Sequence, residues 1–117
     1  MTKPPASATA SIERRPKRRN RVLLGGIVAS VDGSHSFNCM IRDISPGGAR
    51  VFPRGQQVPS NLYLIHIRDR VAYEATVIWN NGKDVGVSFT NQFRLAEIVD
   101  PTKQFLTRLW YDQLAGA

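Results

Sequence analysis

The chain has 117 residues, of which 42% are hydrophobic and 21% charged, so it is long enough to bury one hydrophobic core. A single cysteine, Cys39, excludes an internal disulfide framework and fits a reducing compartment. The first residues contain no apolar run of the signal-peptide type, and no apolar stretch approaches the roughly 20 residues of a membrane span. We therefore expect a cytoplasmic protein with no membrane span.

The net charge of +7 is concentrated near the N-terminus. Residues 1–21 hold seven basic side chains and one acidic one, a net of +6, which leaves +1 for the rest of the chain. Charge gathered in this way indicates an anionic partner such as phosphate, nucleic acid or a membrane surface. Because residues 1–12 show no hydrophobic periodicity, we expect a disordered tail there, followed by a flexible basic arm over residues 13–21.

From Val22 onward, short β-branched and apolar segments alternate with turn residues. The expected strands are residues 22–31, 36–42, 49–52, 61–67, 71–79 and 85–89. Asp32-Gly33 favours a hairpin turn, Gly25-Gly26 a bulge or sharp bend, and residues 43–48 a tight loop. About six short strands of this kind are typical of a small antiparallel barrel or sandwich, so the fold class is all-β.

Near the C-terminus, Asp100-Pro101 favours a helix start, with Asp at the N-cap and Pro at the first helical position. Apolar residues then recur at helical spacing, which predicts one amphipathic helix over roughly residues 101–115. These residues are Phe105, Leu106, Leu109, Trp110 and Leu114. Their stripe either covers an open end or face of the barrel, the interpretation we favour, or forms a surface for a partner protein.

No catalytic or metal-binding constellation is evident in the sequence. His35 and His66 have no paired nucleophile in a recognisable motif, and Asp69 and Asp84 occupy expected turns, where Asp is common. No glycine-rich phosphate loop precedes a helix. The sequence therefore favours a binding module over an enzyme, without metal or cofactor.

Two segments carry binding chemistry. The arm is rich in arginine, which pairs bidentately with phosphate and stacks on planar rings. In the segment Asp43-Ile-Ser-Pro-Gly-Gly, Asp43 can accept from a guanine edge and the Ser45 hydroxyl can donate or accept. Gly48 allows close backbone approach or a positive φ. Taken singly, the arm could be a solvated tail or a non-specific nucleic-acid patch, and Asp43 and Ser45 could simply cap a turn.

Taken together, an RxxxR element followed by a strand hairpin and a (D/N)xSxxG loop resembles the PilZ domain, a bacterial receptor family for cyclic di-GMP. The first motif is matched by Arg14 with Arg18 and by Arg15 with Arg19, and the second by Asp43, Ser45 and Gly48. Residues 75–89 are also similar to the closing hairpin of the family, a hydrophobic strand, a turn and then Val-Gly-Val-x-Phe. The resemblance covers roughly residues 13–93.

The resemblance implies a six-stranded antiparallel β-barrel, which we place at residues 22–93, and a ligand held between the arm and the 43–48 loop. From its apolar stripe, we expect the helix of residues 100–115 to pack on this barrel. Arg15 and Arg19 would then stack on guanine and pair with phosphate, assisted by Arg14 and Arg18. Asp43 and Ser45 would read guanine or phosphate, and Gly48 would permit the approach.

Two further residues have alternative interpretations. Trp79 either offers an aromatic face to a base or belongs to the core. Arg21 directly precedes the first expected strand, so Lys17 with Arg21 is a second register for the arm, in which an ammonium replaces one stacking guanidinium.

The favoured hypothesis is a stand-alone PilZ receptor that binds cyclic di-GMP and signals in trans to a protein partner. One alternative is a ligand-independent protein–protein adaptor that uses the barrel surface and the helix. The other is non-specific nucleic-acid binding through the arm, for which affinity would fall steeply with salt.

Overall fold

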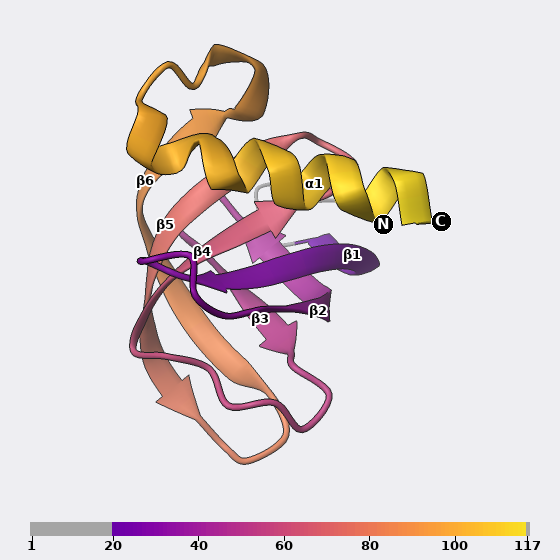
Figure 1. Ribbon diagram of the computed structural model, residues 1–117. Coiled ribbons are helices and arrows are strands. Elements are labelled where there is room, and N and C mark those ends of the chain that lie inside the picture. Colours follow the sequence, from indigo (N-terminus) through magenta and orange to yellow (C-terminus); the bar gives the residue numbers. More distant parts are fainter. Residues whose placement is uncertain (1–19, 117) are drawn as a thin grey trace.

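The computed structural model describes residues 20–116 and the side chains of residues 24–113. This part of the chain forms a closed barrel of six antiparallel strands in the order β1-β2-β3-β6-β5-β4, with one α-helix, α1, after them (Figure 1). The strands are β1 (Asn20–Ser30), β2 (Ser36–Ser45), β3 (Gly48–Phe52), β4 (Asn61–His66), β5 (Val71–Asn80) and β6 (Val85–Arg94). The all-β barrel predicted from the sequence is confirmed.

Closure of the barrel depends on two pairings between strands distant in sequence. β1 pairs with β4, and β3 pairs with β6, so every strand has two hydrogen-bonded neighbours and no sheet edge is left open. The segment between β3 and β4, residues 53–60, carries the chain across one end of the barrel (Figure 1).

Several strands are longer than the sequence pattern predicted. β2 continues to Ser45 and β3 begins at Gly48, so the expected 43–48 loop is wrong, and only Pro46 and Gly47 form the turn. The expected bulge at Gly25-Gly26 is also wrong, because these residues pair in register with Met40 and Cys39. The register of β1 shifts instead between Arg21 and Leu24.

The hydrophobic residues form two clusters, one on each side of β4. The barrel interior contains Val28, Ile41, Val51, Leu62, Leu64, Val85 and Val87, among others. The second cluster contains Ile27, Ala29, Tyr63, Ile65, Ala72, Leu95 and Leu106. Because residues 62–66 are all buried, β4 is covered on both faces, which explains its uninterrupted apolar sequence.

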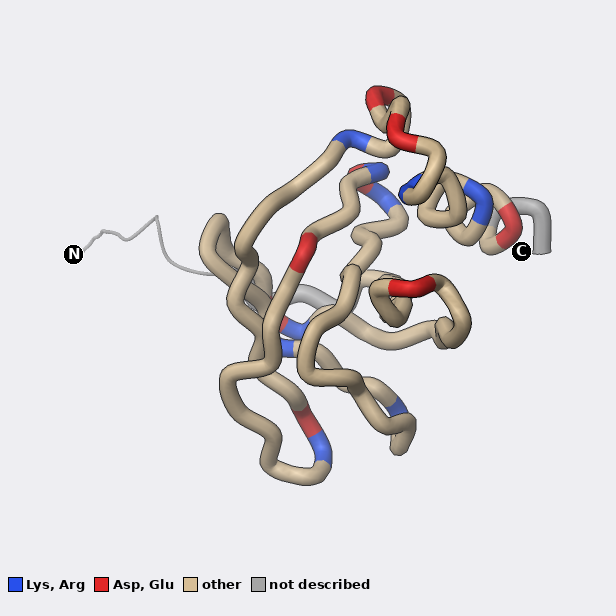
Figure 2. Tube along the Cα trace, turned by 60° about the vertical axis from the view of Figure 1, so that its left-hand side comes forward, with Lys and Arg blue, Asp and Glu red and all other residues tan. Residues whose placement is uncertain are grey.

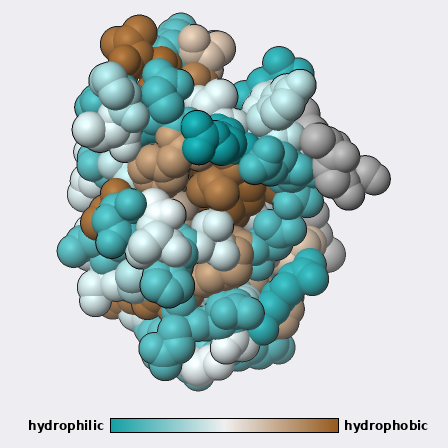
Figure 3. Space-filling view, viewed as in Figure 1, coloured by the Kyte–Doolittle hydropathy of each residue, from teal (hydrophilic) through white to brown (hydrophobic). Residues whose placement is uncertain are grey.

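Helix α1 (Gln104–Gly116) lies across the outside of the barrel and packs against this second cluster (Figure 1). From the same side, the surface shows hydrophobic residues near its middle with hydrophilic residues around them (Figure 3). Leu106 is completely buried, and Trp110 Nε1 donates a hydrogen bond of 2.8 Å to the Ile67 carbonyl. The predicted N-cap is confirmed, because the Asp100 side chain accepts from the Thr102 N–H ahead of a short 3₁₀ turn, Pro101–Lys103. The apolar stripe of α1 therefore covers a face of the barrel, the first of its two predicted roles.

Another 3₁₀ turn, Leu95–Glu97, joins β6 to this region and was not predicted. In the part of the chain that the structure describes, no helix has the length and apolar character needed to cross a membrane.

Candidate functional site

Asp43 and Ser45 lie on the same outward face of β2. Ile41 and Ile44 both pack in the barrel interior although they are three residues apart. In a regular strand, residues three apart point to opposite faces. Here the register against β3 shifts at Arg42, and this bulge breaks the inward–outward alternation. Past that bulge Ile44 points inward, so its two neighbours, Asp43 and Ser45, face away from the core.

The residues that pair with Asp43 from strand to strand form a row across the outer surface of the barrel. Asp43 lies between Arg21 of β1 and Arg50 of β3, Arg50 lies opposite Gly86 of β6, and Gly86 lies opposite Trp79 of β5. The row thus brings the predicted Asp43 onto one face with Trp79 and with the backbone position of Arg21. It also includes Arg50 and Gly86, which the sequence analysis did not select.

A second row runs beside the first and consists of small polar residues. In register order it contains Ser45, Gly48, Ser88, Thr76 and Asn61. Thr76 Oγ1 donates to Asn61 Oδ1 at 3.2 Å. We call these two rows together the polar face. Because the second row has only short side chains, a planar ligand can lie close to the sheet there.

Gly48 is required by the packing of the protein itself. A Cβ atom at this position would collide with the backbone carbonyl of Val87 in β6. The positive-φ alternative for Gly48 is wrong, since the glycines with positive φ are Gly33, Gly55 and Gly82. Ser45 Oγ donates to the Gly48 carbonyl at 3.3 Å, so this serine does stabilise the turn.

Asp43 belongs to a cluster of four charged side chains. Its Oδ2 lies 3.1 Å from Arg50 Nε, Arg50 Nη1 lies 3.8 Å from Asp84 Oδ2, and Arg42 Nε lies 3.1 Å from Asp84 Oδ1. Asp84, predicted to have only turn chemistry, is 7% exposed and is the far anchor of this cluster. The Asp43–Arg50 pair had a signal in the sequence, because a two-residue turn at Pro46-Gly47 places residues 43 and 50 opposite each other.

Trp79 lies on the polar face, so its assignment to the core is wrong. A register shift between Val77 and Trp79 turns both Ile78 and Trp79 outward, and they are 63% and 41% exposed. The indole ring lies against Gly86, where any side chain would overlap it. Trp79 is thus held against β6 at Gly86 while part of its ring stays exposed to solvent.

The side chains of the arm arginines are not among those that the structure describes. Arg14, Arg15, Arg18 and Arg19 lie outside the described residues, and Arg21 is described only by its backbone in β1. Residues 20–116 hold ten basic and eight acidic side chains, a net of +2, and the two signs are intermixed along the trace (Figure 2). The barrel therefore contributes little net charge, and most of the positive charge of the protein precedes β1.

In the described part of the chain, the two histidines and the cysteine lie in separate environments, and His35 Nδ1 is 3.0 Å from Ser34 Oγ. His66 is buried, which lowers its pKa, and its Nδ1 accepts from the Asp69 backbone N–H at 3.2 Å. Burial raises the pKa of the Cys39 thiol to about 12, so it is not a nucleophile at neutral pH. Among residues 20–116, no three His, Cys, Asp or Glu side chains come together as metal ligands.

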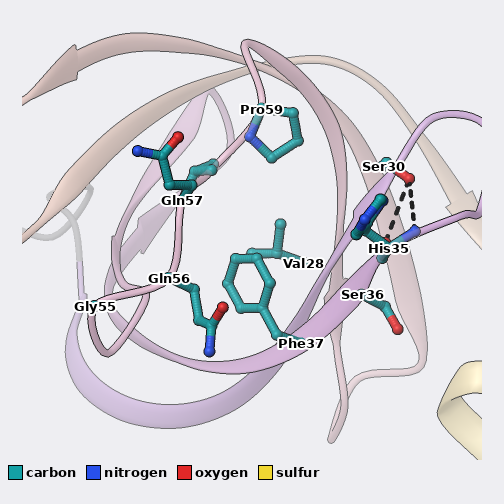
Figure 4. Close-up of a pocket in the computed structure, with 10 residues that line it drawn as sticks. Val28, Ser30, His35, Ser36, Phe37, Gly55, Gln56, Gln57 and Pro59 are labelled. Atoms are coloured by element: carbon teal, nitrogen blue, oxygen red, sulfur yellow. Dashed lines mark hydrogen bonds between the residues drawn. The ribbon is translucent and has the colours of Figure 1, made fainter.

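A cavity of about 520 Å³ lies at the other end of β2 (Figure 4). Its apolar lining includes Val28, Phe37 and Val58, and its polar lining includes His35, Gln56 and Gln57. Asp43, the first residue of the second motif, comes six residues after Phe37 in β2, so it lies roughly 20 Å along the strand from this cavity. None of the predicted site residues lines it.

Comparison with known proteins identifies the family of this chain. The family model of the PilZ domain matches residues 13–100, which are 88 of the 117 residues. A search of curated proteins found no match to this chain. The matched region includes the arginine-rich segment and all six strands of the barrel. The chain therefore belongs to the PilZ domain family.

Proposed function

We propose that this protein is a bacterial cytoplasmic receptor that binds cyclic di-GMP on the polar face and signals in trans to a protein partner. The PilZ family to which it belongs is a family of cyclic di-GMP receptors. The observation that carries the proposal is the register of β1 with β2. Asn20 and Arg21 lie opposite Ile44 and Asp43, so the arginine-rich segment joins the barrel directly beside the second motif.

The chemistry of the two segments is complementary to the two halves of this ligand. Each guanine offers an N1–H and an exocyclic amino group, which the carboxylate of Asp43 can accept. Each phosphate carries a negative charge that the guanidinium groups of Arg15 and Arg19, assisted by Arg14 and Arg18, can pair with bidentately. The accessible ring of Trp79 offers a stacking surface for a base at the other end of the first row.

In this proposal the ligand draws residues 13–19 of the arm against the polar face, next to Asn20 and Arg21, which already pair with β2. The barrel has a net charge close to zero, so most of the attraction for a dianionic ligand comes from the arm. A surface made of ligand, arm and the exposed Ile78 and Trp79 would exist only in the bound state. A protein partner that recognises this composite surface would respond to the ligand concentration.

Isothermal titration calorimetry with cyclic di-GMP tests the proposal, with GTP and a short DNA duplex as controls. We expect micromolar or tighter affinity for cyclic di-GMP and affinity at least about tenfold weaker for GTP, a difference of about 1.4 kcal/mol. A flat titration at high micromolar cyclic di-GMP would contradict the proposal and support a ligand-independent adaptor. Equal binding of DNA and cyclic di-GMP would indicate a non-specific basic module instead.

A further inference from the structure

Arg50 connects the carboxylates of Asp43 and Asp84. Its Nε is 3.1 Å from Asp43 Oδ2, and its Nη1 is 3.8 Å from Asp84 Oδ2. The backbone of Arg50 is fixed by pairing with Asp43 on one side and with Gly86 on the other. Arg50 is therefore the only one of the four charged residues in the cluster that contacts both carboxylates among the described ion pairs.

The hydrogen bonding of this cluster is incomplete. Arg42 Nε, Arg50 Nε and Asp84 Oδ1 are buried, yet within the described part of the chain they have no hydrogen-bond partner. The 3.1 Å contacts of these atoms are ionic, since the N–H groups are not aligned for a hydrogen bond. Buried polar groups left in this state cost free energy, and a cluster that retains three of them calls for a functional explanation.

The charges of the cluster cancel. Arg42 and Arg50 are matched by Asp43 and Asp84, so the cluster as a whole offers no net charge to an anionic ligand. This argues against Arg50 acting mainly as one more phosphate ligand. The geometry of Arg50 suits a different role. Arg50 contacts only Oδ2 of Asp43, and none of the described ion pairs involves the other carboxylate oxygen.

We propose that Arg50 is a positioning residue for guanine recognition, an inference that rests on the function proposed above. Arg50 lies against Asp43 Oδ2 through an ionic contact and is itself held by Asp84. A carboxylate has about four acceptor positions, so Asp43 retains enough to accept both N1–H and the amino group of one guanine. Without Arg50 the carboxylate rotates freely and loses its preference for a base that carries both donors.

The experiment compares two ligands that differ by one donor. Cyclic di-IMP retains N1–H and both phosphates but lacks the 2-amino group, so the ratio of its Kd to that of cyclic di-GMP measures recognition of that group. We expect the wild-type protein to prefer cyclic di-GMP by about tenfold or more. The Arg50→Met variant should bind cyclic di-GMP at least about tenfold more weakly and prefer it by less than about threefold.

Arg42→Met is the matched control, because it removes the same charge from the same cluster without touching Asp43. We expect it to change both affinities by less than about threefold. The double variant Asp43→Ala with Arg50→Met should bind no more weakly than Asp43→Ala alone, since Arg50 acts through Asp43. Thermal melts of all variants separate a loss of binding from a loss of folding.

If Arg50→Met does not fold, Arg50→Lys replaces it, because lysine keeps the charge but its single ammonium lacks the separate nitrogens with which Arg50 contacts Asp43 and Asp84. The same loss of preference is then expected. Equal weakening of both ligands, additive with Asp43→Ala, would show that Arg50 contacts phosphate and would overturn the inference, as would unchanged binding. If the wild-type protein binds neither ligand, the proposed function fails as well, which distinguishes the two outcomes.

Discussion

Gly48 shows how a single residue of the second motif serves the fold. Its backbone lies so close to the Val87 carbonyl that any Cβ must displace β6 or β3. We expect Gly48→Ala to lower the free energy of unfolding by about 1–3 kcal/mol, the usual cost of overpacking. Gly47→Ala is the control, because no atom lies within 4 Å of the Cβ position there. Urea denaturation measures both, and equal stabilities of the two variants would contradict this account.

We expect the arginines of the arm to differ in how strongly a lysine substitution weakens ligand binding. Arg15→Lys and Arg19→Lys should each weaken cyclic di-GMP binding by tenfold or more, because lysine loses the flat stacking contact and one of two parallel hydrogen bonds. Arg21→Lys should change it by less than about threefold. Calorimetry at matched salt concentration makes the comparison, since every arm charge adds some long-range attraction. A loss confined to Arg21, which lies opposite Asp43 in register, would instead indicate the pair of Lys17 and Arg21.

Trp79 provides an optical test of where the ligand lies. The chain has two tryptophans, and Trp110 is a half-buried residue of α1 that donates to the Ile67 carbonyl. If a base stacks on Trp79, cyclic di-GMP should quench the fluorescence of a Trp110→Phe variant. The fluorescence of a Trp79→Phe variant should stay nearly constant. A ligand-dependent signal from Trp110 alone would place the ligand away from the polar face.

At the scale of elements, the sequence predicted the number and order of the strands because turn residues and β-branched runs are local signals. The ends of the strands were less accurate. Asp43 and Ser45 have the composition of a loop, yet they are in β2 because β1 and β3 supply hydrogen-bond partners on both sides. Hydrogen bonding to neighbouring strands overrides the local propensity of these residues, and a short window of sequence does not reveal that bonding.

The role of α1 can be tested by substitutions on its two faces. Leu106 is completely buried against the barrel, whereas Tyr111 is 65% exposed. We expect Leu106→Ala to lower the free energy of unfolding by about 2–5 kcal/mol, because it leaves a cavity in the second cluster. Tyr111→Ala should change it by less than about 0.5 kcal/mol. Chemical denaturation measures both, and a small effect of Leu106→Ala would mean that the helix adds little to the stability of the barrel.

At the scale of the whole molecule, the sequence predicted the barrel and the second motif but not the polar face as a unit. Asp43 and Ser45 were found because they match a short pattern. Arg50 and Gly86 were missed because their relation to Asp43 depends on the pairing of β3 with β6, which joins segments far apart in the chain. The bulge at Arg42, which turns Asp43 outward, is equally invisible in the pattern of apolar residues.

Most of the positive charge of the protein precedes the barrel and can be removed by truncation. Residues 1–19 hold six basic side chains and one acidic one, and their removal leaves every residue of β1 in place. We expect the truncated protein, residues 20–117, to show the β-type circular dichroism spectrum and a cooperative melt. Its affinity for cyclic di-GMP should fall by about a hundredfold or more, because the remaining net charge is only +2 and the guanidinium groups of the arm are gone.

A salt titration completes this test. The affinity of the full chain for cyclic di-GMP should decrease between low and physiological ionic strength, since the arm charges are solvent-screened. The residual binding of the truncated protein, carried by the neutral cluster around Asp43, should depend much less on salt. If truncation leaves the affinity unchanged, the ligand is bound by the barrel alone, and the arm has another role. If truncation abolishes the cooperative melt, residues 1–19 contribute to the core, and their charge cannot be separated from the fold.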